Sequence, residues 1–233
     1  MLTLYYLCQI TGGDAAMPRC RMHSQSGMNR RDFIARSAVL GLALALPSVA
    51  LAGRLRQFNG QVAVNGKPAT ATTEIRSLDV ITTGAGSSAI LVMGGDAFLV
   101  RASSEVELLG KPKAAVVTGL RMLTGALLGV FGKGAPRQLL TATATAGIRG
   151  TGIYMEASAE KTYFCTCYGE VELMDQHRST KRLVLAGYHT PNVIYADMKE
   201  GSMMHKAEYA NHTDEELVML EKLVGRKPAF GKR

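Results

Sequence analysis

Between about residues 59 and 195, short apolar runs alternate with glycine-bearing turns. In the run 105–109, apolar residues at 106 and 108 alternate with glutamates, a period of two that is typical of a strand with one solvent-facing side. The run 89–93 is apolar at every position, which predicts a central strand covered on both faces. The other clear runs are 60–64, 79–83, 97–100, 137–142, 152–156, 162–168 and 170–173. Many short strands at this spacing predict a mainly β fold, a sandwich, barrel or solenoid, rather than alternating strands and helices.

Glycine marks the turns that we expect between these runs. The chain has 25 glycines in 233 residues, above the usual share of roughly 7%. Turns are expected at 65–66, 84–86, 94–96, 132–134 and Gly169. A sharper turn between two strands is expected over 147–152, because Gly147, Gly150 and Gly152 permit a positive φ and a close approach of the backbone.

Near the C-terminus the pattern changes to that of a helix. Thr213 and Glu216 have the spacing of a capping box, in which each side chain binds the backbone of the other. Apolar residues then recur at helical spacing, at Leu217, Leu220, Leu223 and Val224. Gly225 is placed to end the helix. We therefore expect a C-terminal helical segment, 201–233, whose amphipathic helix packs against the β body.

The N-terminal part of the sequence has the three-part pattern of a secretory signal: a charged start, a short apolar stretch and a small-x-small cleavage site. The residues that carry it are Arg30, Arg31 and Phe33 in the charged part, and Ala50 and Ala52 at the cleavage site. The arginine pair followed by Asp-Phe-Ile resembles the twin-arginine export motif. An uncleaved anchor and a buried core helix are the alternatives, but Pro47 interrupts the stretch, which is short for a span of about 20 residues.

These patterns divide the chain into four expected parts. Residues 1–27 are interpreted as a mis-called extension upstream of the true start at Met28, and 28–52 as the twin-arginine-type signal peptide. The β domain is expected over 53–200, followed by the helical segment. The expected location is the periplasm or the exported cell envelope. No run of 18 or more apolar residues occurs, so we expect no stable membrane span.

Charge and composition narrow the expected partners. The formal net charge is +8, but lysine and arginine are scattered rather than clustered, and the chain has no Trp on which bases could stack. A nucleic-acid partner is therefore not expected.

Two segments resemble the FecR domain. The segment 78–93, LDVITTGAGSSAILVM, resembles the opening of that domain, and 140–154, LTATATAGIRGTGIY, resembles its second characteristic stretch. The positions that carry the resemblance are Asp79, Gly84, Gly147, Arg149, Gly150 and Thr151. It extends over about 60–175 and departs from the family pattern at Leu78, where Gly is usual before the acid, and at Ala142, where Pro is usual.

The resemblance implies a β-rich, solenoid-like binding element without catalysis. Typical FecR proteins combine a cytoplasmic helical domain that controls a sigma factor, one membrane span and a periplasmic part. Here the export signal directly precedes the FecR-like body, so direct control of a sigma factor is not expected. We expect a binding or sensory module of the bacterial envelope in an iron-linked signalling setting, with an envelope protein or ligand as its partner.

Arg149 stands between glycines and has two interpretations. It caps strand-end carbonyls or pairs with a buried carboxylate, for which Asp79 is the candidate, or else it recognises an anion. The structural interpretation is favoured because no phosphate-binding loop surrounds it.

Cys165 and Cys167 are the sharpest chemical feature outside this resemblance. On a strand they face the same side with Cα atoms about 6.5–7 Å apart, which is at the limit for a disulfide. The spacing suits two thiolates that converge on a metal, with His189 and His212 as candidate partners and Zn or Fe as the candidate ion. A strained disulfide and two inert buried thiols are the alternatives.

The sequence offers little support for catalysis. It contains no G-x-S-x-G, no Walker-type loop and no H-E-x-x-H, so we do not expect an enzyme. Two functions remain: an exported FecR-like binding or sensory module, and a periplasmic metal-binding protein centred on Cys165 and Cys167 with histidine.

Overall fold

Strands account for most of the residues that the computed structural model describes, 53–112 and 116–230. The strands are β1 (Gly53–Asn59), β2 (Val62–Val64), β3 (Lys67–Pro68), β4 (Glu74–Ile75), β5 (Val80–Thr83), β6 (Ser88–Met93), β7 (Asp96–Val100), β8 (Glu105–Leu109), β9 (Gly119–Val130), β10 (Arg137–Leu140), β11 (Ala144–Ala157), β12 (Lys161–Asp175), β13 (Lys181–Ala186), β14 (Thr190–Lys199) and β15 (Ser202–Lys206). A helix, α2 (Asp214–Leu223), follows them. The predicted mainly β fold with a C-terminal helix is confirmed.

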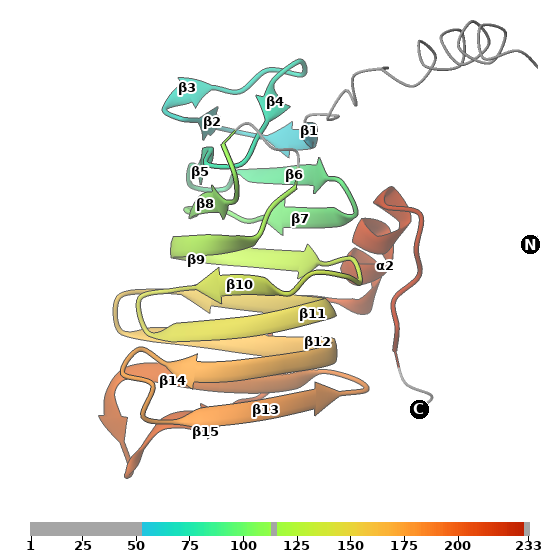
Figure 1. Cartoon of the computed structure of the whole chain (residues 1–233). Coiled ribbons are helices and arrows are strands. Elements are labelled where there is room, and N and C mark those ends of the chain that lie inside the picture. The colour runs from blue at the N-terminus through green and yellow to red at the C-terminus, as the bar shows by residue number, and fades with distance from the viewer. Residues whose placement is uncertain (1–52, 113–115, 231–233) are drawn as a thin grey trace, which may run out of the picture. The chain divides into compact units, whose positions relative to one another are not determined.

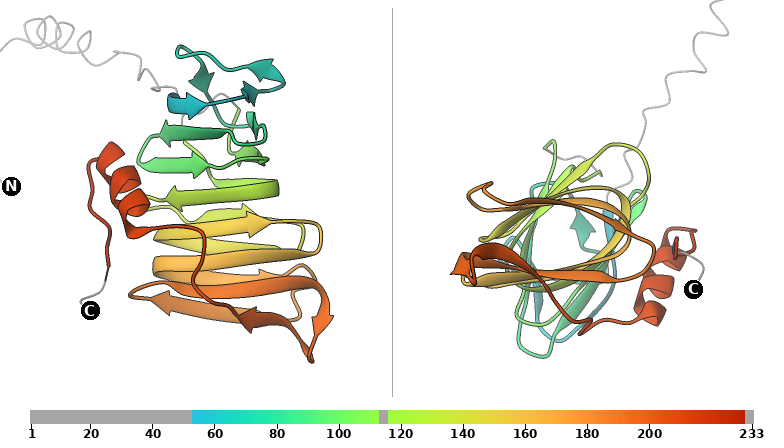
Figure 2. Two further views of the ribbon diagram at one scale, coloured as in Figure 1. Left: turned by 180° about the vertical axis from the view of Figure 1, so that it is seen from behind. Right: turned by 90° about the horizontal axis from the view of Figure 1, so that it is seen from below.

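All of these strands belong to one open sheet. Its main path runs β15-β14-β12-β11-β10-β9-β7-β6-β1-β4, and β13 pairs with β12 beside β14. Neighbours are antiparallel except for β9 and β10, which are parallel. Figure 1 shows the strands stacked along one direction, and the end-on view in Figure 2 shows them winding around a common interior. This is the solenoid-like arrangement among the predicted alternatives.

Alternation along each strand separates two hydrophobic cores. The inner core fills the interior of the winding, and its members include Ala89, Leu91 and Met93 on β6. The outer core lies on the other face of the same strands and includes Ile90 on β6. Because successive side chains point to opposite faces, one strand supplies both cores.

Helix α2 covers the outer core. It contacts β7 and β9, and its buried leucines, Leu217 and Leu220, pack there with Leu99 and Leu128. Its predicted capping box is present, with the Thr213 hydroxyl accepting from the Glu216 amide and the Glu216 carboxylate accepting from the Thr213 amide. Figure 2 shows the helix lying against the side of the winding.

The burial patterns of the longest strands, β11 and β12, show which of their residues are covered on the outer face. In β12, residues 164–168 are all buried, whereas the residues from 170 onward alternate between buried and partly exposed. In β11, residues 151–155 are likewise all buried, and 144–149 alternate. A strand buried on both faces needs an apolar cover on its outer side as well as a core beneath it. These central stretches have both.

The glycine-rich motif does not form the predicted turn. Residues 147–152 lie inside β11, and Gly169 lies inside β12. The pairing of these two strands shifts between Arg149 and Gly152, where Gly150 has a φ of 61° opposite Gly169 with a φ of 96°. A β-bulge with left-handed glycines bends a strand pair without ending it. The predicted break is therefore a bend in two continuous strands.

Three glycines of the motif have different roles. Gly150 supplies the left-handed backbone of the bulge. At Gly152 a Cβ would lie 2.4 Å from the Tyr168 ring, so this glycine makes room for the aromatic side chain. Gly147 has neither constraint, since its φ is not positive and a Cβ there would meet no atom within 4 Å. The expected sharp turn forms at none of the three, and Gly147 has neither the positive φ nor the close approach expected of it.

The strand boundaries differ from the predicted ones in two further places. The runs 162–168 and 170–173 form the single strand β12, because the bulge at Gly169 keeps the pairing with β11. At the other end, β15 extends the sheet to Lys206, so the β body continues beyond the predicted boundary at residue 200. Strands β1, β3, β4, β9, β13, β14 and β15 were not among the predicted runs.

Candidate metal centre

Cys165 and Cys167 face outward from β12 into the outer core. They lie on the same side of the strand, as predicted from their i, i+2 spacing, while Phe164 belongs to the inner core. Both cysteines are free and fully buried. The C-terminal segment covers this part of the sheet, so the two thiols are closed off from solvent by residues far away in the sequence.

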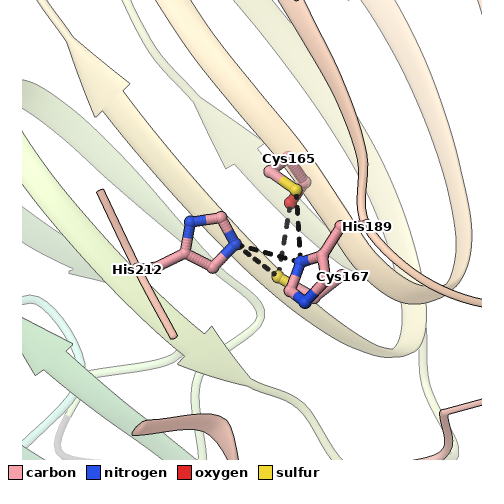
Figure 3. Close-up of side chains that lie close together, drawn as sticks. All are labelled: Cys165, Cys167, His189 and His212. Atoms are coloured by element: carbon pink, nitrogen blue, oxygen red, sulfur yellow. Dashed lines mark hydrogen bonds between the residues drawn. The ribbon is translucent and has the colours of Figure 1, made fainter. Parts of the chain in front are cut away.

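Two histidines complete the group. His189 lies just before β14, and His212 lies immediately before Thr213, the N-cap of α2. The four side chains Cys165, Cys167, His189 and His212, called the Cys/His cluster below, each offer one ligand atom, and these atoms all lie within 4.8 Å of one another. Figure 3 shows the four side chains converging. They are the residues that the sequence suggested for a metal.

The distances within the cluster are close to those around one tetrahedral ion. Cys165 Sγ lies 3.7 Å from His189 Nδ1, Cys167 Sγ lies 3.4 Å from His212 Nε2, and the two histidine nitrogens are 3.1 Å apart. Zinc bonds of about 2.3 Å to sulfur and about 2.05 Å to nitrogen place tetrahedral ligands roughly 3.3 to 3.8 Å from one another. The two sulfur–nitrogen separations fall in this range, the nitrogen–nitrogen separation is slightly shorter, and the widest separation in the cluster reaches 4.8 Å, so the side chains would adjust by about an ångström to bind a single ion.

Hydrogen bonds outside the cluster orient both imidazole rings. His212 Nδ1 lies 2.8 Å from the Ala210 carbonyl oxygen, which can only accept, so Nδ1 carries the proton. His189 Nε2 lies 2.8 Å from Asp214 Oδ1 and donates to this carboxylate. In the neutral rings, the remaining nitrogens then direct lone pairs at the same point. A carboxylate or carbonyl behind a histidine is the usual support of a metal ligand.

Two lone pairs that face each other at 3.1 Å require a positive charge between them. A proton or a metal ion supplies it, and the adjacent sulfurs favour the metal because soft ligands beside imidazole suit zinc. The cluster therefore offers four ligand atoms, with both imidazole rings oriented toward its centre.

The thiols differ in their titration. Hydrogen bonding by the Cys167 thiol lowers the pKa of Cys165 to about 4, against the opposing effect of burial and with the help of His189 and His212. Burial raises the pKa of Cys167, and the adjacent Cys165 thiolate raises it further. Burial lowers the pKa of His189, but Cys165 and Asp214 outweigh it, so the net shift is upward. These directions favour the thiolate at Cys165, and they favour the protonated forms of Cys167 and His189, whose protons a bound metal would displace.

Aromatic side chains surround the cluster. The Tyr154 ring stacks on His212 with centroids 4.5 Å apart and an interplanar angle of 19°. Tyr188, Tyr209 and Phe230 lie around His189, with centroids 4.3, 4.4 and 6.0 Å from it. The His189 side chain is 3% exposed and His212 is 4% exposed. This shell leaves no side of the cluster open to water.

The geometry discriminates between classes of metal site. Four protein ligands without an open position are typical of a structural zinc site, whereas a catalytic zinc keeps one position for water or substrate. A Rieske-type cluster binds its two cysteines to one iron and its two histidines to the other. Here each sulfur lies beside a histidine nitrogen, so the arrangement fits a single ion.

The residues of the FecR-like motif lie elsewhere. Asp79 accepts hydrogen bonds from Asn65 Nδ2 at 2.8 Å and from the Arg76 amide at 2.7 Å, so it ties two turns together. It does not pair with Arg149, which is exposed on β11. The expected Asp79–Arg149 pair is therefore wrong.

Two other positions of the motif have structural contacts. Buried Thr151 donates its hydroxyl to the Glu170 carbonyl across the bulge. Gly84 approaches Gln61, whose side-chain oxygen would lie 3.0 Å from a Cβ at this position. Neither residue is a member of the Cys/His cluster.

The remaining predicted residues concern export and membrane spanning. Arg30, Arg31, Phe33, Ala50 and Ala52 lie outside the described residues. Within 53–112 and 116–230, no helix has the length and apolar character needed to cross a membrane.

Sequence reasoning missed the residues that support the ligands. Asp214 holds His189, the Ala210 carbonyl holds His212, and Tyr154 stacks on His212. Only Asp214 has a signal in the sequence, since an acid at the first position of a helix stands two residues after a candidate ligand. The other two follow from how the C-terminal segment crosses the sheet.

Comparison with known proteins gives few matches. No family model matches the chain, and no curated protein matches it. Two crystal structures of a protein from Parabacteroides distasonis described as a "putative anti-sigma factor" are similar to it, each 14% identical with a TM-score of 0.45. Each match covers 55% of this chain and 58% of that one. The chain thus spans less than two thirds of the solved structures that it matches.

Proposed function

We propose that this protein is a metal-binding module whose centre is a zinc ion held by the Cys/His cluster. The observation that carries the proposal is the convergence of four ligand atoms within 4.8 Å, two of them histidine nitrogens oriented from behind by a carboxylate and a carbonyl. The thiols and imidazoles contact one another, and two imidazole nitrogens face each other at 3.1 Å. A bound ion uses all four.

Zinc fits this donor set better than iron, the second candidate. Two sulfurs and two nitrogens at tetrahedral separations suit zinc, which has no preference for a higher coordination number. The closed coordination supports a structural or sensory role rather than catalysis, so the proposal does not include an enzyme.

The setting that we propose is the bacterial envelope. The signal-like segment 28–52 supports export to the periplasm, and its arginine pair supports the twin-arginine route. That route carries folded proteins, so the metal would be bound before export. A site that closes only when the C-terminal segment folds over the sheet suits this order of events.

Metal analysis of the purified full chain tests the proposal. We expect one zinc per chain by native mass spectrometry, lost on chelation and restored by added Zn²⁺. Cys167→Ser and His212→Ala should each abolish stoichiometric binding. His177→Ala is the matched control, because this histidine is exposed and outside the cluster. A chain that carries no metal and takes up none, or variants that bind as the native protein does, would overturn the proposal.

A second candidate function rests on the FecR-like segments 78–93 and 140–154. By that resemblance, the protein is an envelope interaction module in iron-linked signalling, with a partner protein or ligand and no metal of its own. Iron in place of zinc at the Cys/His cluster would connect the two candidates. A bare polypeptide with two free thiols would favour the interaction module alone, and a mass lower by two hydrogens would show a disulfide.

A further inference from the structure

The Cys/His cluster joins parts of the chain that are otherwise far apart. Cys165 and Cys167 belong to β12, whereas His212 immediately precedes the N-cap of α2. The first residue of the helix, Asp214, holds His189 through its carboxylate. A metal at this point would therefore connect the sheet directly to the first turn of the helix.

The helix that starts at the cluster covers an apolar face. Beneath α2 lie four buried side chains of the sheet: Ile90, Leu99, Leu128 and Val130. They face outward from strands whose inner sides already have a core. Without the helix, this part of the outer face would be a contiguous exposed apolar patch, which soluble proteins rarely show unless it has a use.

The helix cannot be expected to hold its own structure away from the sheet. It has 10 residues, and isolated helices shorter than about 12 residues are marginal in water. Its stability therefore comes from docking. Formation of the helix, its docking and closure of the cluster are parts of one event.

The two ends of α2 make different polar contacts with the rest of the protein. At the C-terminal end, Glu221 accepts from the Tyr168 hydroxyl and pairs with Arg226, whose guanidinium also donates to the Gly95 carbonyl. Near the N-terminal end, Glu216 pairs with Arg101 at 2.8 Å, but both side chains are about a quarter to a third exposed. The segment just before this end is also held by hydrogen bonds from Arg101 to the Asn211 carbonyl and from Asn211 to Glu156, and the Cys/His cluster with its supports adds the most buried contacts.

We infer that metal binding at the Cys/His cluster and docking of α2 are coupled, so that the bound metal stabilises the docked helix. This inference rests on the proposed function. With metal bound, the segment from His212 through α2 closes over the outer core. Without it, the start of the helix is released and the apolar face around Leu99 and Leu128 becomes accessible. The presence or absence of the metal thereby controls whether this apolar surface is exposed.

Coupling of this kind is reciprocal. If the metal stabilises the docked helix, a change that lowers the docked fraction of the metal-free chain must also weaken metal binding, even at a residue that touches no ligand. The metal-competent state is the docked one, so the apparent affinity falls with the fraction of chains that are docked. A purely local metal site would show neither effect.

Hydrogen exchange and metal affinity on the full chain test the inference together. Removal of Zn²⁺ by a chelator should speed amide exchange in 212–220 by about tenfold or more, with little change in β2, β5 and β8, whose buried side chains belong to the inner core. Leu220→Ala, a fully buried position that is not a ligand, should weaken Zn²⁺ affinity by roughly tenfold in competition with a chromophoric chelator. Val218→Ala is the control, since Val218 lies on the same helix with 48% of its side chain exposed, and it should leave the affinity unchanged.

The outcomes separate this inference from the proposed function. If the chain binds one zinc but exchange in α2 is unchanged on its removal, and Leu220→Ala binds zinc as the native chain does, the coupling is wrong and the metal site stands. If the chain binds no metal, both are overturned. Should Leu220→Ala fail to fold, Arg101→Gln replaces it, with an expected loss of about two- to threefold because the Glu216 pair is partly exposed.

Discussion

The two faces of the wound sheet carry two cores of different composition, both supplied by the same strands. The inner core is built almost wholly from aliphatic and aromatic side chains, and the strands alone enclose it. The outer core contains two thiols and two tyrosines, and it is closed by a helix from the other end of the chain. Its polar members are satisfied through the Cys/His cluster and through contacts such as Tyr168 with Glu221.

This difference predicts where stability and chemistry reside. The inner core depends on apolar area and close packing, so its loss should unfold the protein without regard to metal. The outer core depends on the arrangement of a few polar groups, so changes there should affect metal binding and the helix before they affect the sheet.

The largest effect is expected in the inner core. Phe98 is fully buried and meets Phe131 edge to face, with ring centroids 5.3 Å apart. Phe98→Ala should lower the free energy of unfolding by about 3–5 kcal/mol, because it removes apolar contacts and leaves a cavity. Denaturant titration measures the loss, and Leu123→Ala, at a side chain 50% exposed, should change it by less than about 0.5 kcal/mol. An equal effect of the two variants would contradict the assigned core.

A smaller loss is expected where the glycine motif meets the outer core. Gly152→Ala would place a Cβ 2.4 Å from the Tyr168 ring, and the ring or the strand must shift. We expect a cost of about 1–3 kcal/mol, together with weaker metal binding if Tyr168 no longer positions Glu221 of the helix. Gly147→Ala is the matched control five residues earlier, because its Cβ meets nothing within 4 Å, and it should be nearly neutral. Equal losses would show that the motif is constrained as a whole.

The sequence predicted the fold class, the helix and the four members of the Cys/His cluster for identifiable reasons. Period-two runs, a capping box and a C-x-C pair on a strand are local signals. The structure has strands, a capped helix and two same-side cysteines at these residues. The bends at Gly150 and Gly169 were misplaced as turns because a glycine with positive φ has the same local signature in a turn and in a bulge. Only the pairing of β11 with β12 distinguishes the two.

Long-range contacts account for what the sequence could not provide. His212 reaches Cys167 because the segment after β15 crosses the outer face, and no local pattern encodes this path. For the same reason Asp79 was assigned to Arg149 rather than to Asn65. The pair was chosen by charge alone, whereas the structure uses Asp79 to hold two turns close to it in the sequence.

Asp175, which belongs to neither core, allows the pH dependence of stability to be tested. Burial raises the pKa of Asp175, but hydrogen bonds from Thr180, Ser179 and His177 more than offset this, so its pKa lies below its usual range. A depressed carboxyl pKa stabilises the fold above the unfolded pKa near 3.9, and this contribution is lost as pH falls through the folded value. Asp175→Asn should therefore cost about 1–2 kcal/mol at pH 7, and its difference from the native chain should shrink below pH 4. Asp197→Asn, at an exposed position, is the control and should show no such trend.

The smallest change in stability is expected at Tyr154, where two substitutions distinguish the contribution of the ring from that of the hydroxyl. The ring stacks on His212, while the hydroxyl donates to Glu156 at 2.8 Å, and Asn211 Nδ2 donates to the same carboxylate oxygen. Tyr154→Phe keeps the stack and leaves Glu156 with a donor, so we expect a loss of only about 0.5–1 kcal/mol in stability and unchanged zinc stoichiometry. Tyr154→Leu, which removes the aromatic face from His212, should weaken zinc binding in the same assay. Loss of metal in the phenylalanine variant would mean that the hydroxyl network, rather than the aromatic shell, keeps His212 in position.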